Sequence, residues 1–375
     1  MATFDPHNVN LDTVDQSQII CYLALGHNEY NGSLGARVSS IFVIGIVSSV
    51  FTFFPVVAKR APRVRIPLYV YLFARYFGAG VIIATAFVHL LDPAYSRIGS
   101  QSCVGMTGHW GDYAWCPAIV LFSLMMVFLL DFGAERYVEK KYGICREDPE
   151  PIMTTGTHVH QVEAQNPDRP PPHPNPHPHP HFESPSAPSS LETKEKKAND
   201  IETLSCDDSI MVRSFRQQIS AFLIMEFGVI FHSVIIGLNL GVTGNEFATL
   251  YPVLVFHQSF EGLGIGARMS AIPFPRDSPL PWLLCAAYGL TTPIAIAVGL
   301  GVRTTYNPDS FTAMVVAGVL DAVSAGILIY TGLVELLARD FLFDPHRTTD
   351  DRRLTFMVVS LLLGAGIMAL LGKWA

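Results

Sequence analysis

The chain has few charged residues for its length and few cysteines. Of its 375 residues, 15% are Asp, Glu, Lys or Arg, whereas about 25% is usual in soluble proteins. Six cysteines are too few for a disulfide-stapled scaffold. A net charge of −7 leaves no basic surface for nucleic acid. The composition therefore excludes a soluble globular protein, a fibrous protein and a nucleic-acid-binding protein.

Long apolar stretches are what the chain has instead. Each is long enough to cross a lipid bilayer as a helix, and they lie at 38–57, 67–91, 116–133, 217–243, 248–269, 280–302, 311–338 and 354–373. We therefore predict an all-α polytopic membrane protein with eight transmembrane helices. Residues 1–34 are polar and lack the features of a cleavable signal peptide. Helices one to three fall in 35–138, and helices four to eight in 213–375.

The Lys and Arg residues of the short connections predict the orientation, because cytoplasmic loops are enriched in them. Ten lie on one side of the bilayer and three (Arg97, Arg303 and Lys373) on the other. The ten are Lys59, Arg60, Arg63, Arg65, Arg268, Arg276, Arg339, Arg347, Arg352 and Arg353. Both termini are therefore predicted to be extracellular.

The segment 139–212 differs in composition from the rest of the chain. Its proline density and low hydrophobicity predict a disordered cytoplasmic loop between helices three and four. The loop carries His158, His160, His173, His177, His179 and His181. These imidazoles could bind Zn²⁺, or the segment could be a histidine-biased linker without a function. Its lysines could also be sites of ubiquitin-type modification.

Cys103 and Cys116 fall in the predicted outward loop 92–116, where a disulfide is chemically permitted if the membrane faces the cell exterior. Two outcomes are open. The two cysteines could form a bridge, or both could be free thiols with Cys116 buried at a helix start.

The fourth and fifth apolar stretches contain ionisable residues. His257 and Glu261 are four residues apart, so they project from one helical face and could hold one divalent cation. His232 and Ser233 on the fourth helix could complete a metal site, and Gln258 could add an amide oxygen. A single membrane histidine is more often a hydrogen-bonded packing residue. Three ionisable residues in adjacent helices indicate an ion path, because they are costly at this depth.

Two glycine pairs predict how these helices meet. Gly237 with Gly241, and Gly262 with Gly266, have the Gly-xxx-Gly spacing that allows close backbone approach. We expect this packing to bring the face of the fourth helix that carries His232 against the face of the fifth helix that carries His257. Weaker candidates for an entrance or pathway are His89, Asp92, Glu226, Asn239, Asp321 and Glu335.

Several segments together resemble a known family. The motif that begins at His232 (His-Ser-Val-Ile-Ile-Gly-Leu-Asn-Leu-Gly) and the one that begins at His257 (His-Gln-Ser-Phe-Glu-Gly-Leu-Gly-Ile-Gly) resemble the signature helices of ZIP metal transporters. Segments that begin at Arg65 and Tyr330 resemble the family's fungal plasma-membrane zinc importers. The resemblance covers nearly everything from about residue 27 to 375 except 145–205.

This resemblance implies a fold and a function. The fold is an inverted 3+2+3 repeat with helices four and five in the centre. The function is Zn²⁺ uptake across the plasma membrane, with His232, His257 and Glu261 as primary ligands and Ser233 and Gln258 at the second-metal positions. Ile236 stands where many relatives have a Glu, so a single-metal or weaker second site is expected. A homodimer is left open.

Two other functions compete with transport. One is an intramembrane zinc-dependent hydrolase with His89, His232 and His257 as ligands, although no His-Glu-xx-His motif is present. The other is a metal-sensing receptor that signals through 139–212. We predict no enzyme activity and no resident cofactor. Imidazole and carboxylate ligands do not separate Zn²⁺ from Fe²⁺, Mn²⁺ or Cd²⁺.

Overall fold

The computed structural model describes residues 10, 13–26, 30–61, 67–142, 192–275, 277–343 and 348–374. Within these residues all regular structure is helical. The chain divides into two units, one formed by Met1–Arg136 with Ser214–Ala375 and the other by Tyr137–Arg213. The six histidines predicted to bind metal in the loop lie outside the described residues.

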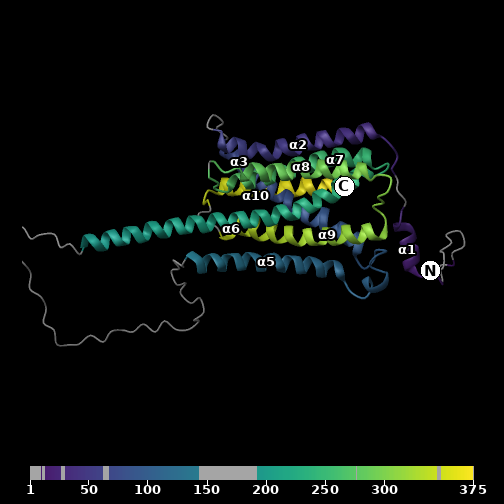
Figure 1. The fold of residues 1–375 in the computed structure, drawn as a ribbon, viewed down its shortest axis with the longest axis horizontal. Helices are drawn as coiled ribbons and strands as arrows, with labels where there is room; N and C mark the ends of the chain where they lie inside the picture. Colours follow the sequence, from purple (N-terminus) through teal and green to yellow (C-terminus); the bar gives the residue numbers. More distant parts are fainter. Residues whose placement is uncertain are drawn as a thin grey trace, which may run out of the picture. The chain divides into compact units, whose positions relative to one another are not determined.

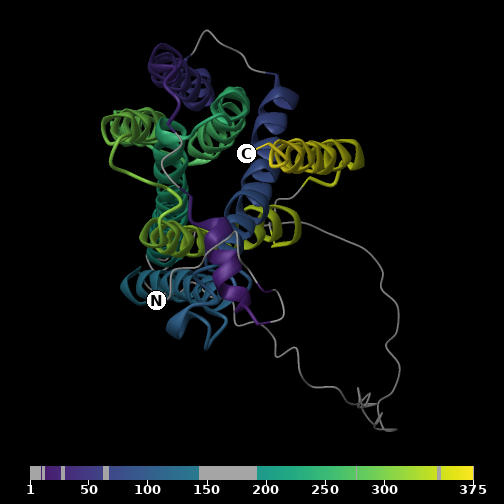
Figure 2. The ribbon, with the colours of Figure 1, turned by 90° about the vertical axis from the view of Figure 1, so that its right-hand side faces the viewer.

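The first unit is a bundle of long helices that lie side by side (Figures 1 and 2). The helical elements of the chain are α1 (Gln16–Ala24), α2 (Leu34–Arg60), α3 (Leu68–Ala84), η1 (Thr85–Leu91), α4 (Asp92–Ile98), η2 (Gly108–Trp110), α5 (Trp115–Tyr142), α6 (Glu192–Val242), α7 (Phe247–Ala271), α8 (Leu280–Gly301), α9 (Phe311–Tyr330), η3 (Thr331–Phe343) and α10 (Asp351–Leu371). The elements α3, η1 and α4 form one continuous rod, as do α9 and η3.

Polar residues and prolines at the helix ends explain where the rods begin and end. Ser310 accepts a hydrogen bond from the Ala313 amide at the start of α9, and Asp350 accepts one from the Arg352 amide at the start of α10. Both interactions satisfy amides that have no partner inside the helix. The prolines of 272–279 prevent α7 from continuing into α8.

Seven helical segments among the described residues are long and apolar enough to cross a membrane. They correspond to the predicted spans one to four and six to eight. The predicted fifth span is α7, whose 25 residues also suffice in length. Its buried His257, Gln258 and Glu261 lower its hydropathy, and it packs against α2, α3 and α8. The structure is therefore that of a multi-pass membrane protein with α7 inside the bundle.

The described helices extend into both ends of 139–212, the segment predicted to be a disordered loop. Helix α5 continues to Tyr142, and α6 already begins at Glu192. The physical reason lies in the composition, because no proline occurs between Pro188 and Pro252. A proline-free stretch that leads into an apolar helix can extend that helix outward.

Helices α2, α3–α4 and α5 form one half of the bundle, and α8, α9–η3 and α10 form the other half in the same order. Contacts made by one half have counterparts in the other, with α6 and α7 as the central pair that is exchanged. Helix α2 packs on α7, and α8 packs on α6 through Gly237 and Ala295. The α3–α4 rod packs on α10, and α9 packs on α5 through Gly326 and Ser123. Likewise α3 contacts α7, and α9 contacts α6 at Gly228. Equivalent helices are five spans apart and so run in opposite directions, as the predicted inverted repeat requires.

Two ion pairs connect the middle rods of the two halves. Arg75 on α3 bonds Asp340 on η3, with 2.7 Å between Nη2 and Oδ2. Arg97 on α4 bonds Asp321 on α9. Both arginines belong to the first half and both aspartates to the second, and the pairs lie at opposite ends of the rods.

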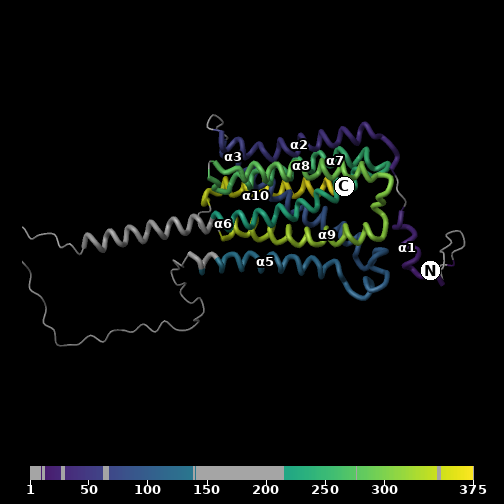
Figure 3. Tube along the Cα trace, viewed as in Figure 1, coloured from purple at the N-terminus to yellow at the C-terminus, as the bar shows by residue number. Residues whose placement is uncertain are grey.

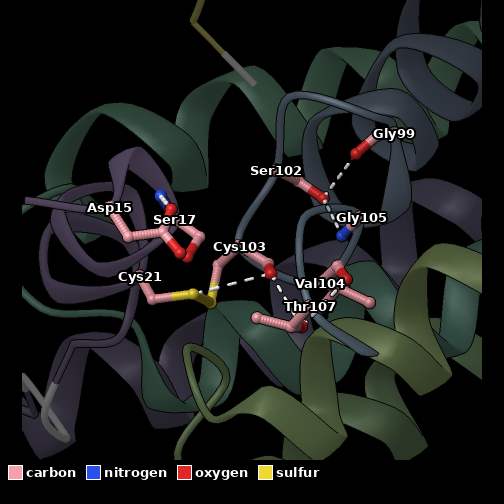
Figure 4. The surroundings of a disulfide bond; sticks show 9 residues. All are labelled: Asp15, Ser17, Cys21, Gly99, Ser102, Cys103, Val104, Gly105 and Thr107. Carbon is pink, nitrogen blue, oxygen red and sulfur yellow. Dashed lines mark hydrogen bonds between the residues drawn. A yellow bond between two sulfur atoms is a disulfide. The ribbon is translucent and has the colours of Figure 1, made fainter. Parts of the chain in front are cut away.

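A disulfide fastens α1 to the loop that follows α4. Cys21 is bonded to Cys103, with 4.5 Å between their Cα atoms (Figure 4). The Cys103–Cys116 bridge that the sequence left open is therefore wrong. Cys116 is a free, fully buried thiol at the start of α5, as the alternative expected for this residue. The alternative is wrong for Cys103, which it left unpaired. A partner 82 residues away in sequence could not be found from local spacing.

Peptide mapping of the purified protein under non-reducing conditions is expected to recover a Cys21–Cys103 cross-linked peptide. The thiols of Cys116 and Cys285 should react with a maleimide only after denaturation, because both are buried. A cross-link that includes Cys116 would contradict this assignment. Cys285→Ser is the matched control and should leave the map unchanged.

Candidate metal-binding site

Three potential metal ligands meet in the centre of the bundle. His232 comes from α6, and His257 and Glu261 come from successive turns of α7. Their nearest ligand atoms all lie within 4.8 Å of one another, and each side chain is at most 1% exposed. The structure thus brings together the three residues that the sequence predicted as primary ligands.

The spacing of these atoms suits one small divalent cation. His257 Nε2 lies 3.7 Å from Glu261 Oε2, which is too far for an ordinary hydrogen bond. Ligand atoms about 2.1 Å from a tetrahedral zinc ion lie about 3.4 Å apart. A cation bound between His257 and Glu261 would therefore draw these two side chains only slightly closer. Two imidazoles and one carboxylate form a three-ligand set with an open fourth position.

Several polar atoms of the site have no protein partner. Within the described residues, His232 Nε2, His257 Nε2 and Glu261 Oε1 are buried and make no hydrogen bond. Buried polar groups without partners are costly, and they usually mark a functional site or a bound ion. The unpaired atoms point to a site that is completed by a cation.

Tyr288 of α8 supports the site, and the sequence analysis missed it. Its hydroxyl lies 3.0 Å from Gln258 Oε1 and 3.1 Å from Glu261 Oε2. A hydrogen bond from this fully buried hydroxyl orients the Glu261 carboxylate, in the way that outer partners orient metal ligands. Tyr288 lies in an otherwise apolar stretch, so no local pattern marked it.

Two of the three residues, His232 and His257, border a small cavity. Its volume is about 180 Å³, and its polar lining is His89, Asp92, Arg97, His232, Asn239, His257 and Asp321. The His89 ring centroid lies 4.9 Å from that of His257. His89 belongs to η1, a π-helical turn of a kind that is frequent at functional sites. Four of the weaker candidates (His89, Asp92, Asn239 and Asp321) thus lie beside the predicted ligands.

A larger cleft adjoins this cavity. It measures about 800 Å³ and shares Arg97, Asn239 and Leu250 with the cavity lining. The cleft also contains residues of the 302–310 connection and of the C-terminal end, including Lys373. The metal ligands are therefore connected to the end of the bundle where α1 lies and α10 finishes (Figure 3). Arg97 stands where the two spaces join.

The remaining candidates are not part of this cavity. Glu226 is buried, and within the described residues its two carboxylate oxygens have no hydrogen-bond partner. Glu335 on η3 is held by Arg339 at 2.6 Å and lies 3.8 Å from Arg268. Ser233 and Gln258 are fully buried next to the primary ligands in sequence.

The predicted role of the glycine pairs is wrong. A Cβ atom at Gly237 would lie 2.6 Å from Ala295 Cβ on α8, and one at Gly262 would lie 2.7 Å from Thr52 Oγ1 on α2. The glycines therefore pack α6 on α8 and α7 on α2. Gly241 and Gly266 are each nine residues, or about two and a half turns, beyond the histidine of their helix. The extra half turn places each of these glycines on the opposite face of its helix from the histidine.

A helical bundle that spans a membrane and holds buried imidazole and carboxylate ligands next to an open cleft defines the class of metal-ion transporters. The chain belongs to the ZIP family, because the sequence profile of the family described as ZIP Zinc transporter matches residues 34–372.

Three relatives support this assignment. "Zinc-regulated transporter 1" of Saccharomyces cerevisiae is 55% identical over 99% of this chain and 97% of its own length. "Zinc-regulated transporter 1" of Schizosaccharomyces pombe is 41% identical over 93% and 88%. "Zinc transporter 9" of Oryza sativa subsp. japonica is 32% identical over 90% and 89%. No solved structure gives a significant match.

Proposed function

We propose that the protein carries Zn²⁺ into the cytoplasm through the site formed by His232, His257 and Glu261. The observation that carries the proposal is the buried three-ligand cluster beside a cavity that joins an open cleft. Membership of the ZIP family and the zinc-related names of the relatives support the choice of metal. Zinc is the substrate here and not a resident cofactor.

A single strong metal site fits the ligand set best. Ser233 and Gln258 are proposed as weaker ligands at a second position, where neither residue brings a charge. Ile236 removes the carboxylate that a second divalent ion would need for charge balance. Fe²⁺, Mn²⁺ and Cd²⁺ are further candidates, because imidazole and carboxylate ligands also accept them.

The proposed path begins in the 800 Å³ cleft, passes Arg97 and Asn239, and reaches the ligands beside His89. Asp92 and Asp321 accompany the ion in the cavity. Glu226 lies earlier on α6, nearer the opposite end of the bundle, and is the next carboxylate on the way out. An inward-negative membrane potential contributes about 2.3 kcal/mol per charge per 100 mV to this flux.

Location and orientation are proposed on the basis of sequence and architecture. Both ends of the transmembrane part lie at the same end of the bundle (Figure 3), and the excess of Lys and Arg at the other end supports extracellular termini. The plasma membrane is the expected location. Zinc binding by the loop histidines, modification of Lys194, Lys196 and Lys197, and a homodimer stay predictions from the sequence.

Radiotracer uptake into liposomes that contain only this protein tests the proposed function. We expect saturable ⁶⁵Zn entry that unlabelled Zn²⁺ suppresses more strongly than Mn²⁺ or Fe²⁺. Hydrolysis of lipid or peptide without metal flux would favour the intramembrane hydrolase. Saturable binding without flux would favour the metal-sensing receptor. Either result would contradict transport.

Tyr288→Phe is expected to raise the KM for zinc by about 10–100-fold, the usual cost of losing an outer partner of a metal ligand. The phenyl ring keeps the packing of α8, and only the hydroxyl that binds Gln258 and Glu261 is lost. The measurement is the concentration dependence of zinc uptake. The matched control is Tyr113→Phe, which removes an exposed hydroxyl and should leave KM unchanged.

A further inference from the structure

A second, separate cleft lies where α2, α7 and α8 meet at the end of the bundle remote from the metal cavity's opening. Its volume is about 600 Å³. The walls are mostly apolar and include Val56, Met269 and Phe274, while Lys59 and Arg60 supply the charge. None of its residues belongs to the metal site, so the proposed transport does not account for it.

The two cations of this cleft have no acidic partner in the part of the chain that the structure describes. The Lys59 ammonium donates to the carbonyl oxygen of Ser270. The Arg60 guanidinium makes two long bonds, to the carbonyl oxygens of Ser278 at 3.4 Å and Pro275 at 3.3 Å. Carbonyl groups orient these cations but leave their full charge in place. Lys59 has further donors, since an ammonium group carries three.

The depth of the cleft in the membrane indicates what compensates this charge. Arg60 is the last residue of α2, and Trp282 lies in the first turn of α8. The Arg60 guanidinium lies over the Trp282 ring at 5.5 Å from its centroid. Tryptophan and arginine in this arrangement are typical of the level of the lipid headgroups. Below them, Val57 and Leu283 are 44% and 64% exposed on the outside of the bundle, where acyl chains would lie.

We propose that this cleft binds the headgroup of an anionic phospholipid. The lipid phosphate would accept charge-assisted hydrogen bonds from Lys59 and Arg60. Its acyl chains would follow the exposed apolar faces of α2 and α8. Such a lipid connects three helices, one of which, α7, carries His257 and Glu261. The proposal is independent of which metal is transported, or whether any metal is transported at all.

Native mass spectrometry of the full-length protein in mixed detergent and lipid micelles tests the proposal. With equal amounts of phosphatidylinositol and phosphatidylcholine, the wild-type protein should retain the anionic lipid about tenfold more often, a ratio equivalent to about 1.4 kcal/mol. The double variant Lys59→Gln/Arg60→Gln should lose this preference. The charge-preserving variant Lys59→Arg/Arg60→Lys should keep most of it.

Controls separate the lipid site from general effects of charge. Lys373→Gln removes one cation near the other end of the bundle, over the Trp374 ring, and should retain the anionic lipid like the wild type. A wild-type unfolding temperature and a single symmetric peak in gel filtration verify that the double variant is folded. Equal retention of the two lipids by the wild type would overturn the proposal, as would an unchanged preference in the folded double variant. Complete displacement of the lipid by inorganic phosphate would assign the cleft to free phosphate instead.

Discussion

His257→Ala is expected to abolish zinc uptake, with a fall of about 100-fold or more, since even outer partners of metal ligands contribute 10–100-fold. The substitution removes the central member of the cluster, because the His257 ring neighbours both His232 at 5.5 Å and His89 at 4.9 Å between centroids. Glu261 alone on α7 would then face the cation with one histidine. Initial rates of ⁶⁵Zn uptake into cells or liposomes measure the loss.

The controls for this variant must separate chemistry from folding. His109→Ala removes an exposed histidine of the loop between α4 and α5 and should retain wild-type uptake. Surface labelling must find His257→Ala at wild-type abundance in the membrane. His232→Ala is expected to behave in the same way as His257→Ala. Normal uptake by both variants would contradict the site assignment.

Asp321→Asn is expected to reduce zinc uptake by about tenfold or more and to lower the thermal stability of the protein. Asp321 is 1% exposed and binds the Arg97 guanidinium at the junction of cleft and cavity. The substitution removes the carboxylate charge that pairs with Arg97, although the amide oxygen can still accept a hydrogen bond. The arginine charge left behind also repels a divalent cation in the same space. Uptake kinetics and the unfolding temperature in detergent measure the two effects.

Two further variants decide why Asp321→Asn loses activity. The double variant Asp321→Asn/Arg97→Gln removes both charges and should recover much of the uptake, because a neutral pair leaves no unpaired ion. Asp340→Asn breaks the matching pair with Arg75, outside the cavity. It should lower the stability and leave the KM for zinc unchanged. An equal rise of KM in Asp340→Asn would contradict the local role of Asp321.

The long helices and the cluster of His232, His257 and Glu261 could be predicted from the sequence, because both depend on local patterns. Apolar stretches of bilayer length mark the spans, and the spacing of His257 and Glu261 places both on one helical face. The prediction of a metal site next to His232 needed only that two consecutive helices be neighbours. Residue type and helical period were sufficient for these features.

The rest depended on contacts between distant parts of the chain. Cys21 and Cys103 are separated by 82 residues, and Tyr288 reaches Glu261 from another helix. The glycine pairs were correctly identified as packing positions, but their partners were wrong because a small residue does not specify which helix approaches it. The helical start of α6 was missed, since a composition averaged over 139–212 concealed a proline-free end.

The distribution of charge over the two ion pairs has a consequence for biosynthesis. Arg75 and Arg97 enter the membrane with the second span, whereas Asp321 and Asp340 are made more than two hundred residues later. Until η3 arrives, Arg75 must be accommodated in the bilayer without its partner, at an appreciable cost in free energy, and Arg97 lacks its partner at the end of the same span until α9 is made. If a fragment that contains only the first half paired with a copy of itself, its arginines would face the arginines of the copy and repel them. Both arginines are therefore paired only in a chain that extends through η3.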